Sequence, residues 1–295
     1  MRKWAFIFAL IACFDVNAWE SCGTDATGNT ANCEYQIIDG TLTIRGVGEN
    51  GNIGYWWNDE GWTNEDFTSP WKGKTFQNII VEDSVKDLGS WGFFGVTSQN
   101  LIQLPNVDTI GYSALRSVTA REVVISDSTN LISEGAFVEA NIQKIELSDS
   151  IETIGPWVFR NSLLRDIVIP DNVKNIDVSA FSGCSNLQSL TIGENTILGA
   201  IFDWSGEERS ENLNNLKIYC TGDTAKCDAN LKAAGYSDFK SVKATTQKIN
   251  GVTYVYDDKG KLVTTSGRRT EKRIYTVDEA NRVSGKINRF SIRYR

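Results

Sequence analysis

The segment Tyr55–Trp71, "YWWNDEGWTNEDFTSPW", holds the densest group of side chains with binding chemistry in the chain. Aromatic faces beside carboxylates suit stacking on sugars or hot spots for protein partners, and the acidic oxygens could also hold calcium. Trp56, Trp57 and Trp62 are therefore candidate binding residues. The alternative is that these indole rings cover the open end of a hydrophobic core, which is the interpretation we favour for Trp71.

Catalytic chemistry has little support in the composition. The chain has 0 histidines, which excludes histidine-based triads and histidine metal sites, and neither a phosphate-binding glycine loop nor a nucleophile elbow occurs. Acid pairs such as Asp59 with Glu60 lie in a loop, and sequence alone does not place two carboxylates across a sugar. We therefore predict a protein that is not an enzyme, with no catalytic residue, metal site or cofactor.

The N-terminus has the pattern of a secretory signal peptide. Two basic residues precede an apolar run, Trp4–Phe14, and the small-residue pattern Val16-Asn17-Ala18 follows. The run is too short to cross a bilayer as a helix, so the mature chain is not expected to be transmembrane. We predict cleavage after Ala18 and a secreted or cell-surface location. A lipoprotein anchor at Cys13 is the alternative.

The remaining cysteines would then face an oxidising compartment. Two local pairs, Cys22 with Cys33 and Cys220 with Cys227, would clamp the two ends of the fold. Cys184 lies in a small-residue column and is predicted to be a buried free thiol. Zinc is the competing interpretation, but the spacing is not that of short paired zinc ligands.

The body of the chain repeats with a step of 22 residues. Three columns keep this step, and Thr129 is their one member that is not plainly apolar. The columns are Val85, Val107, Thr129, Ile151 and Val173; Leu88, Ile110, Ile132, Ile154 and Ile176; and Phe93, Leu115, Phe137, Phe159 and Phe181. A fixed period of this length is typical of a solenoid whose units must stack to bury their apolar faces.

Short runs with alternating apolar residues precede each set of columns and read as strands with one buried face. Examples are Ile79 with Val81 and Ile145 with Leu147. The residues between such pairs would point away from the core: Ile80, Ile102, Val124, Glu146 and Val168. Four of these five are apolar, so this strip is a candidate protein-binding face, although we favour the alternative that a loop or the C-terminal part covers it.

These repeats resemble the BspA-like leucine-rich repeats, whose units read approximately "L..V.IP.SV..IG..AF..C..L". The best copy is Leu164–Ile192, "LRDIVIPDNVKNIDVSAFSGCSNLQSLTI", while Thr129 and Leu115 depart from the pattern. Residues 40–51 and 69–71 are similar to the segment that precedes the first repeat in such proteins. The resemblance covers roughly residues 20–220 and implies adhesion to host extracellular proteins or to other microbes.

Charge divides the chain unevenly. Residues 240–295 hold 14 Lys and Arg against 5 Asp and Glu, although the whole chain has a net charge of −7. An acidic body argues against nucleic acid as a partner. The basic tail could contact an anionic envelope polymer or the body itself, or be only a solvated face.

We predict five segments: a signal peptide (1–18), an N-terminal cap (19–71), BspA-like leucine-rich repeats (72–215), a C-terminal cap (216–245) and a basic C-terminal module (246–295). The second cap should hold a short helix from Asp228 to Gly235, with Asp228 as N-cap. The module should contain a hairpin around residues 258–260, followed by a strand, a helix capped by Thr276 and another strand.

The predicted fold class is an α/β repeat: a leucine-rich-repeat solenoid of about 22-residue units with stacked short parallel strands, disulfide-clamped caps and a small C-terminal α+β module. The function that follows is an exported, non-enzymatic binding or adhesion protein from a bacterium, which presents its coils to a protein partner. The alternatives are a structural envelope component anchored by the basic module, and a carbohydrate-binding accessory protein that uses the tryptophan loop.

Overall fold

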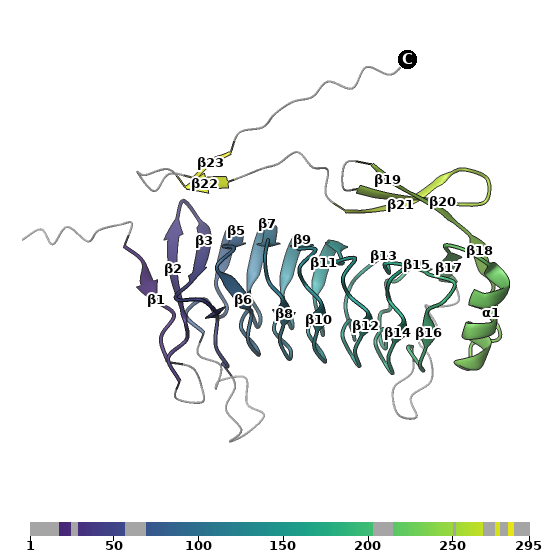
Figure 1. Cartoon of the computed structure of the whole chain (residues 1–295), viewed down its shortest axis with the longest axis horizontal. Helices are drawn as coiled ribbons and strands as arrows, with labels where there is room; N and C mark the ends of the chain where they lie inside the picture. Colours follow the sequence, from purple (N-terminus) through teal and green to yellow (C-terminus); the bar gives the residue numbers. More distant parts are fainter. Residues whose placement is uncertain are drawn as a thin grey trace, which may run out of the picture.

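The computed structural model describes residues 18–24, 29–56, 69–202, 215–249, 252–267, 275–277 and 283–285. The signal peptide with Cys13, the acid pair Asp59 with Glu60, and the candidates Trp57 and Trp62 lie outside these residues. Within them the chain forms a solenoid of short strands and turns, whose coils stand side by side in Figure 1.

One side of the solenoid is a long sheet. Its first part has the order β1 (Glu20–Ser21), β2 (Cys33–Ile38), β3 (Thr41–Gly46), β5 (Thr75–Val81), β7 (Thr97–Leu104), β9 (Thr119–Ile125) and β11 (Asn141–Glu146). A second sheet follows with β13 (Asp166–Val168), β15 (Ser189–Ile192), β17 (Lys217–Cys220) and β18 (Ser241–Lys243). Pairing is antiparallel from β1 to β3 and parallel from β3 onward, as stacked coils require.

The opposite side of each coil is a two- or three-residue strand. These form two further sheets: β4 (Gly51–Asn52), β6 (Val85–Asp87), β8 (Thr109–Ile110) and β10 (Leu131–Ile132), and then β12 (Thr153–Ile154), β14 (Asn175–Ile176) and β16 (Ile197–Leu198). Between the two sides lies the core. All three predicted columns are buried, including Thr129, and the rings of Phe137, Phe159 and Phe181 stack with centroids 5.5 and 5.4 Å apart.

Polar side chains tie each coil to the one before it. The buried hydroxyl of Thr129 donates to the carbonyl of Val107 at 2.5 Å, which explains how a polar residue fits an apolar column. On the turns, Asn106, Ser150 and Asn172 donate to carbonyls of the preceding coil. Polar side chains as well as apolar ones therefore hold neighbouring coils together at equivalent positions of the repeat.

Aromatic rings close the N-terminal end of the core. Trp71 is fully buried, stacks on Phe93 at 5.6 Å and donates its indole N–H to the carbonyl of Gly92 at 2.6 Å. Trp56 packs edge-on against Trp71. The disulfide Cys22–Cys33 pins the cap strands beside them, as predicted.

The C-terminal end is closed by a helix, α1 (Thr224–Ala233), and by the rings of Phe202, Tyr236 and Phe239. The predicted N-cap was wrong. Asp223 caps α1 through the N–H of Ala225, whereas Asp228 lies inside the helix and accepts from the backbone and hydroxyl of Ser241. The predicted disulfide Cys220–Cys227 is present, and it joins β17 to α1.

The chain then turns back as an antiparallel sheet of β19 (Thr245–Ile249), β20 (Val252–Tyr256) and β21 (Leu262–Gly267), which confirms the predicted hairpin. Two further strands, β22 (Tyr275–Val277) and β23 (Val283–Gly285), pair with each other. The predicted helix over this stretch is therefore wrong at both of its ends. No helix in the described residues is long and apolar enough to cross a membrane.

Candidate functional site

The outer face of the long sheet carries a continuous row of side chains. Backbone register aligns one residue per strand along it: Thr43, Ile80, Gln103, Val124 and Glu146, and then Val168, Thr191, Tyr219 and Val242 in the second sheet. Four of the five predicted strip residues belong to this row. The prediction for Ile102 was wrong, because its side chain is fully buried in the core and Gln103 occupies the outer position.

A bulge explains the error at Ile102. Strand β7 has an extra residue between Ser98 and Leu101, so Ile102 pairs with Ile79 and Val123 rather than with their outer neighbours. The turn that follows β7 is one residue shorter than the turn after β9, which restores the step by Val107. The 22-residue period therefore survives although the strand inside it is displaced by one.

The hairpin sheet covers the C-terminal half of this outer row. Val255 of β20 is fully buried and forms a separate apolar cluster with Val168, Tyr219 and Ala244. Figure 1 shows β19 to β21 lying above β13 to β17. The prediction that the C-terminal part of the chain covers the strip is therefore correct for Val168. Val124 is also buried, whereas Ile80 and Gln103, at the other end, are half-buried.

A second column on the same face is exposed and polar, and it was not identified from the sequence. Its members are Gln77, Gln99, Arg121, Gln143 and Arg165, all exposed and again 22 residues apart. Arg165 donates to the exposed Gln188 of the next coil at 3.1 Å. Applying the 22-residue step to the start of each strand would have found this column.

Trp56 is not a surface residue. Its ring is 1% exposed, and its indole N–H donates to the carbonyl of Ile53 at 2.9 Å. A side chain with its polar group satisfied and its ring inside the core cannot stack on a ligand without unfolding of the cap. The prediction of Trp56 as a binding residue was therefore wrong, and the capping alternative holds for it and for Trp71. Trp57 and Trp62 stay predictions.

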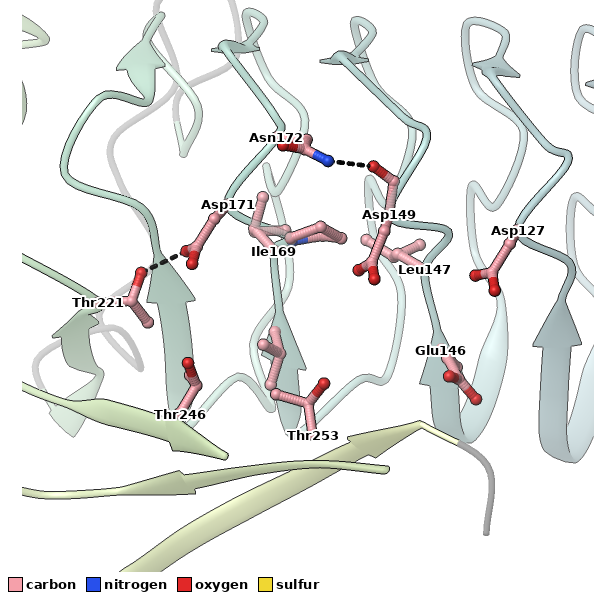
Figure 2. Close-up of a pocket in the computed structure, with 12 residues that line it drawn as sticks. Asp127, Glu146, Leu147, Asp149, Ile169, Asp171, Asn172, Thr221, Thr246 and Thr253 are labelled. Carbon is pink, nitrogen blue, oxygen red and sulfur yellow. Dashed lines mark hydrogen bonds between the residues drawn. The ribbon is translucent and has the colours of Figure 1, made fainter. Parts of the chain in front are cut away.

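A cavity of about 230 Å³ lies between the turns after β9, β11 and β13 and the hairpin sheet. Figure 2 shows Asp127, Asp149 and Asp171 projecting from successive turns, with Thr246 and Thr253 entering from the hairpin strands. Glu146 is the fourth acidic residue of the lining, and it belongs to the predicted strip, as does Val168, which also lines the cavity.

Local bonds hold this acidic cavity in shape. Asn172 donates its amide to the carbonyl of Asp149 at 2.7 Å, and the hydroxyl of Thr221 donates to the carboxylate of Asp171 (Figure 2). Such a lining suits an ammonium or guanidinium group better than an anion. No set of three or more acidic or sulfur ligands is arranged to hold a metal ion anywhere in the part of the chain that the structure describes.

Cys184 has no chemistry of its own at the surface. It is the buried free thiol that its column predicted, and its Sγ donates to the carbonyl of Phe159 at 3.0 Å. Burial raises the pKa of this thiol to about 11, partly opposed by hydrogen bonds from Ser162. A neutral, enclosed thiol is a poor nucleophile.

The fold defines a leucine-rich-repeat solenoid. Residues 69–188 and 108–221 match a model described as the BspA type leucine rich repeat region, with six copies. The two matches together span just over half of the chain, and the chain belongs to this family. Membership indicates a repeat protein for protein interaction. Such proteins are typically not enzymes and are typically extracellular or on the cell surface, which the two disulfides fit.

Three solved structures of bacterial leucine-rich-repeat proteins match parts of the chain. A leucine-rich repeat protein from Eubacterium ventriosum is 18% identical over 56% of this chain and 43% of its own, with a TM-score of 0.46. A leucine rich cell surface protein from Faecalibacterium prausnitzii is 14% identical over 68% of this chain and 96% of its own, with a TM-score of 0.32. A leucine-rich repeat protein from Bacteroides ovatus is 16% identical over 65% of this chain and 70% of its own, with a TM-score of 0.24.

This chain thus spans less than half the length of the Eubacterium protein. No curated protein sequence matches it.

Proposed function

We propose that this protein is exported and acts as an adhesin, which binds an extracellular protein through the N-terminal half of its outer sheet face. The observation that carries the proposal is the exposed column of Gln77, Gln99, Arg121 and Gln143 beside the half-buried Ile80. Because these side chains are exposed, the core does not require their identity.

The chemistry of this face suits a polar protein surface. Each Gln amide both donates and accepts, and Arg offers a planar set of donors that favours carboxylates and aromatic faces. Lys144 and Glu122 form an ion pair at 3.1 Å between neighbouring strands on the same face. Contacts repeat with the strand spacing of about 4.8 Å, so many weak interactions can add up on one partner.

Rigidity supports the same role. Disulfides and aromatic covers close both ends of the core, so the spacing of the column is fixed before a partner arrives. A binding surface that is already ordered loses less conformational entropy on association. The predicted signal peptide and the disulfides support an extracytoplasmic location.

The test is a charge reversal with a matched control. The oxidised protein, residues 19–295, is measured by surface plasmon resonance against extracellular-matrix proteins, mucins and isolated bacterial envelope. We expect Arg121→Glu to weaken binding of a captured matrix protein or mucin at least about tenfold, since Arg is often a hot-spot residue.

The control is Lys174→Glu. It makes the same change in net charge, but Lys174 pairs with Glu152 on the opposite side of the solenoid and is 65% exposed. Equal loss with both variants would show a nonspecific charge effect. Binding only to envelope, abolished by salt and by removal of residues 246–295, would replace adhesion with anchoring by the basic module.

A further inference from the structure

A second cavity, of about 390 Å³, lies at the junction of the N-terminal cap and the first coils. Residues 29–32 of the cap form one wall, and residues 52–55 and 87–90 of the coils form the other. Its size falls within the range of about 300–1,000 Å³ that is usual for small-molecule sites. It is separate from the Gln and Arg column on the outer sheet face.

The polar groups of this cavity are fixed before any ligand binds. Asn52 accepts from the N–H of Gly54 at 2.6 Å and donates its amide toward Asp87 at 3.4 Å, and Asp87 accepts from the N–H of Gly89 at 2.7 Å. Gly89 has φ of +66°, and a side chain there would collide with the carbonyl of Gly54. The coil wall is therefore rigid and closely packed.

A disulfide holds the cap wall. Cys33 follows Asn32 directly and is bonded to Cys22, and the N–H of Cys22 donates to the carbonyl of Cys33 at 3.0 Å. The N–H of Ala31 donates to the carbonyl of Gly23 at 2.9 Å. This disulfide and the pairing of β2 with β3 together fix the cap wall, whereas the coils keep their own strand pairing.

The repeat does not require a carboxylate at the position of Asp87. Asp87 pairs with Thr109 in the next coil, and the same position holds Leu131 and Ile197 farther along the solenoid. Burial nevertheless raises the pKa of Asp87, with the Gly89 N–H opposing the rise, and no ion pair to Asp87 occurs among the described residues. Partial desolvation of the Asp87 carboxylate costs free energy, at a position where other coils hold uncharged residues. Hydrogen bonds from a ligand could offset this cost.

The lining selects the kind of ligand. It combines the amides of Asn32 and Asn52, one carboxylate at Asp87, the hydroxyl of Ser90 and the aromatic ring of Tyr55. It contains neither Lys nor Arg, so it offers no charge for an anion, and a single carboxylate with amides gives little for a multivalent cation. Neighbouring hydroxyl groups of a ligand can donate to a carboxylate and accept from amides. An aromatic ring can pack against a ligand face made of C–H groups.

We propose that this cavity binds a neutral carbohydrate. The sugar hydroxyls donate to the Asp87 carboxylate and accept from the amides of Asn32 and Asn52, while Tyr55 contacts the apolar face of the ring. This site is independent of the adhesion proposed above, and the two are lost through different substitutions.

The test uses saturation-transfer NMR on residues 19–295 with the methyl glycosides of glucose, galactose, mannose and N-acetylglucosamine. We expect at least one glycoside to bind, and Asp87→Thr to weaken that binding about tenfold or more, as loss of charge-assisted hydrogen bonds would. Thr is the residue that the next coil carries at this position, so the variant should fold. Unchanged circular dichroism and melting temperature confirm that it does.

The matched control is Asn175→Thr, which changes the same position four coils farther along and should leave binding unaltered. Replacing both Cys22 and Cys33 by Ser, which leaves Cys220–Cys227 intact, should weaken binding. The proposal is overturned if none of the four glycosides binds, if Asp87→Thr and Asn175→Thr have the same effect, or if binding disappears with EDTA, which would indicate a cation site.

Discussion

The two halves of the outer sheet face differ although the same row of backbone positions builds both. In the C-terminal half the row holds Val168, Tyr219 and Val242, and the hairpin sheet packs on it through Val255. In the N-terminal half the row holds Ile80, Gln103 and Glu146, which are half-buried, and Thr43 and Val124, which are buried. The same repeat position is therefore covered by a segment of the chain itself in one half, and in the other half it lies on the face that we propose for an external partner.

Substitution by aspartate should separate the two halves most strongly. Val255→Asp places a charge in a fully buried apolar cluster, and we expect it to cost about 3 kcal/mol or more of hairpin docking. Ile80→Asp, on a half-buried position of the other half, should cost about 1 kcal/mol or less. Hydrogen exchange of the hairpin amides together with melting temperatures measures both effects.

The expected pattern is local. Val255→Asp should accelerate exchange in β19 to β21 while β5 to β11 stay protected, since few contacts of the coils depend on the hairpin. Similar losses for the two variants would mean that another segment covers Ile80 as tightly as the hairpin covers Val168, and the proposed binding face would then be closed.

Removal of the hairpin should have a smaller effect than Val255→Asp, and this effect should be measurable as a change in the pKa of Tyr219. Burial raises the pKa of this phenol, and the carboxylates of Asp257, Asp166 and Asp258 add to the rise. Because the folded-state pKa lies above the unfolded value of about 10, the contribution of the neutral phenol to docking is complete below that pH. It is lost as the pH rises through the folded-state pKa.

In the fragment of residues 19–245 the pKa of Tyr219 should fall toward its ordinary value. The difference between wild type and Tyr219→Phe in absorbance titration near 295 nm isolates this group from the other tyrosines. An identical midpoint with and without residues 246–295 would show that the hairpin does not enclose Tyr219 in solution.

The sequence predicts the stacked architecture well because the core repeats. The three columns, both disulfides and the buried Cys184 follow from a constant step and from the need to cover each end. The same step should have identified the exposed Gln and Arg column. The alternation within the strands selects apolar residues, and it therefore does not reveal a periodic column of polar residues.

Other features depend on contacts that no local pattern contains. The bulge in β7 and the shorter turn after it compensate each other, so Ile102 looks like an outer residue although it is in the core. Either Asp223 or Asp228 could cap a helix in this segment, and in the structure Asp223 is the cap while Asp228 lies inside α1 and accepts from Ser241. Docking of Val255 on Val168 and Tyr219 joins segments far apart in the chain.

The most direct test of the proposed binding face is hydrogen-exchange mass spectrometry of the full mature chain with and without its captured extracellular protein partner. We predict that the partner slows exchange in β5, β7, β9 and β11 and leaves β12, β14 and β16 unchanged. Protection confined to the opposite side of the solenoid, or to residues 246–295, would contradict the account.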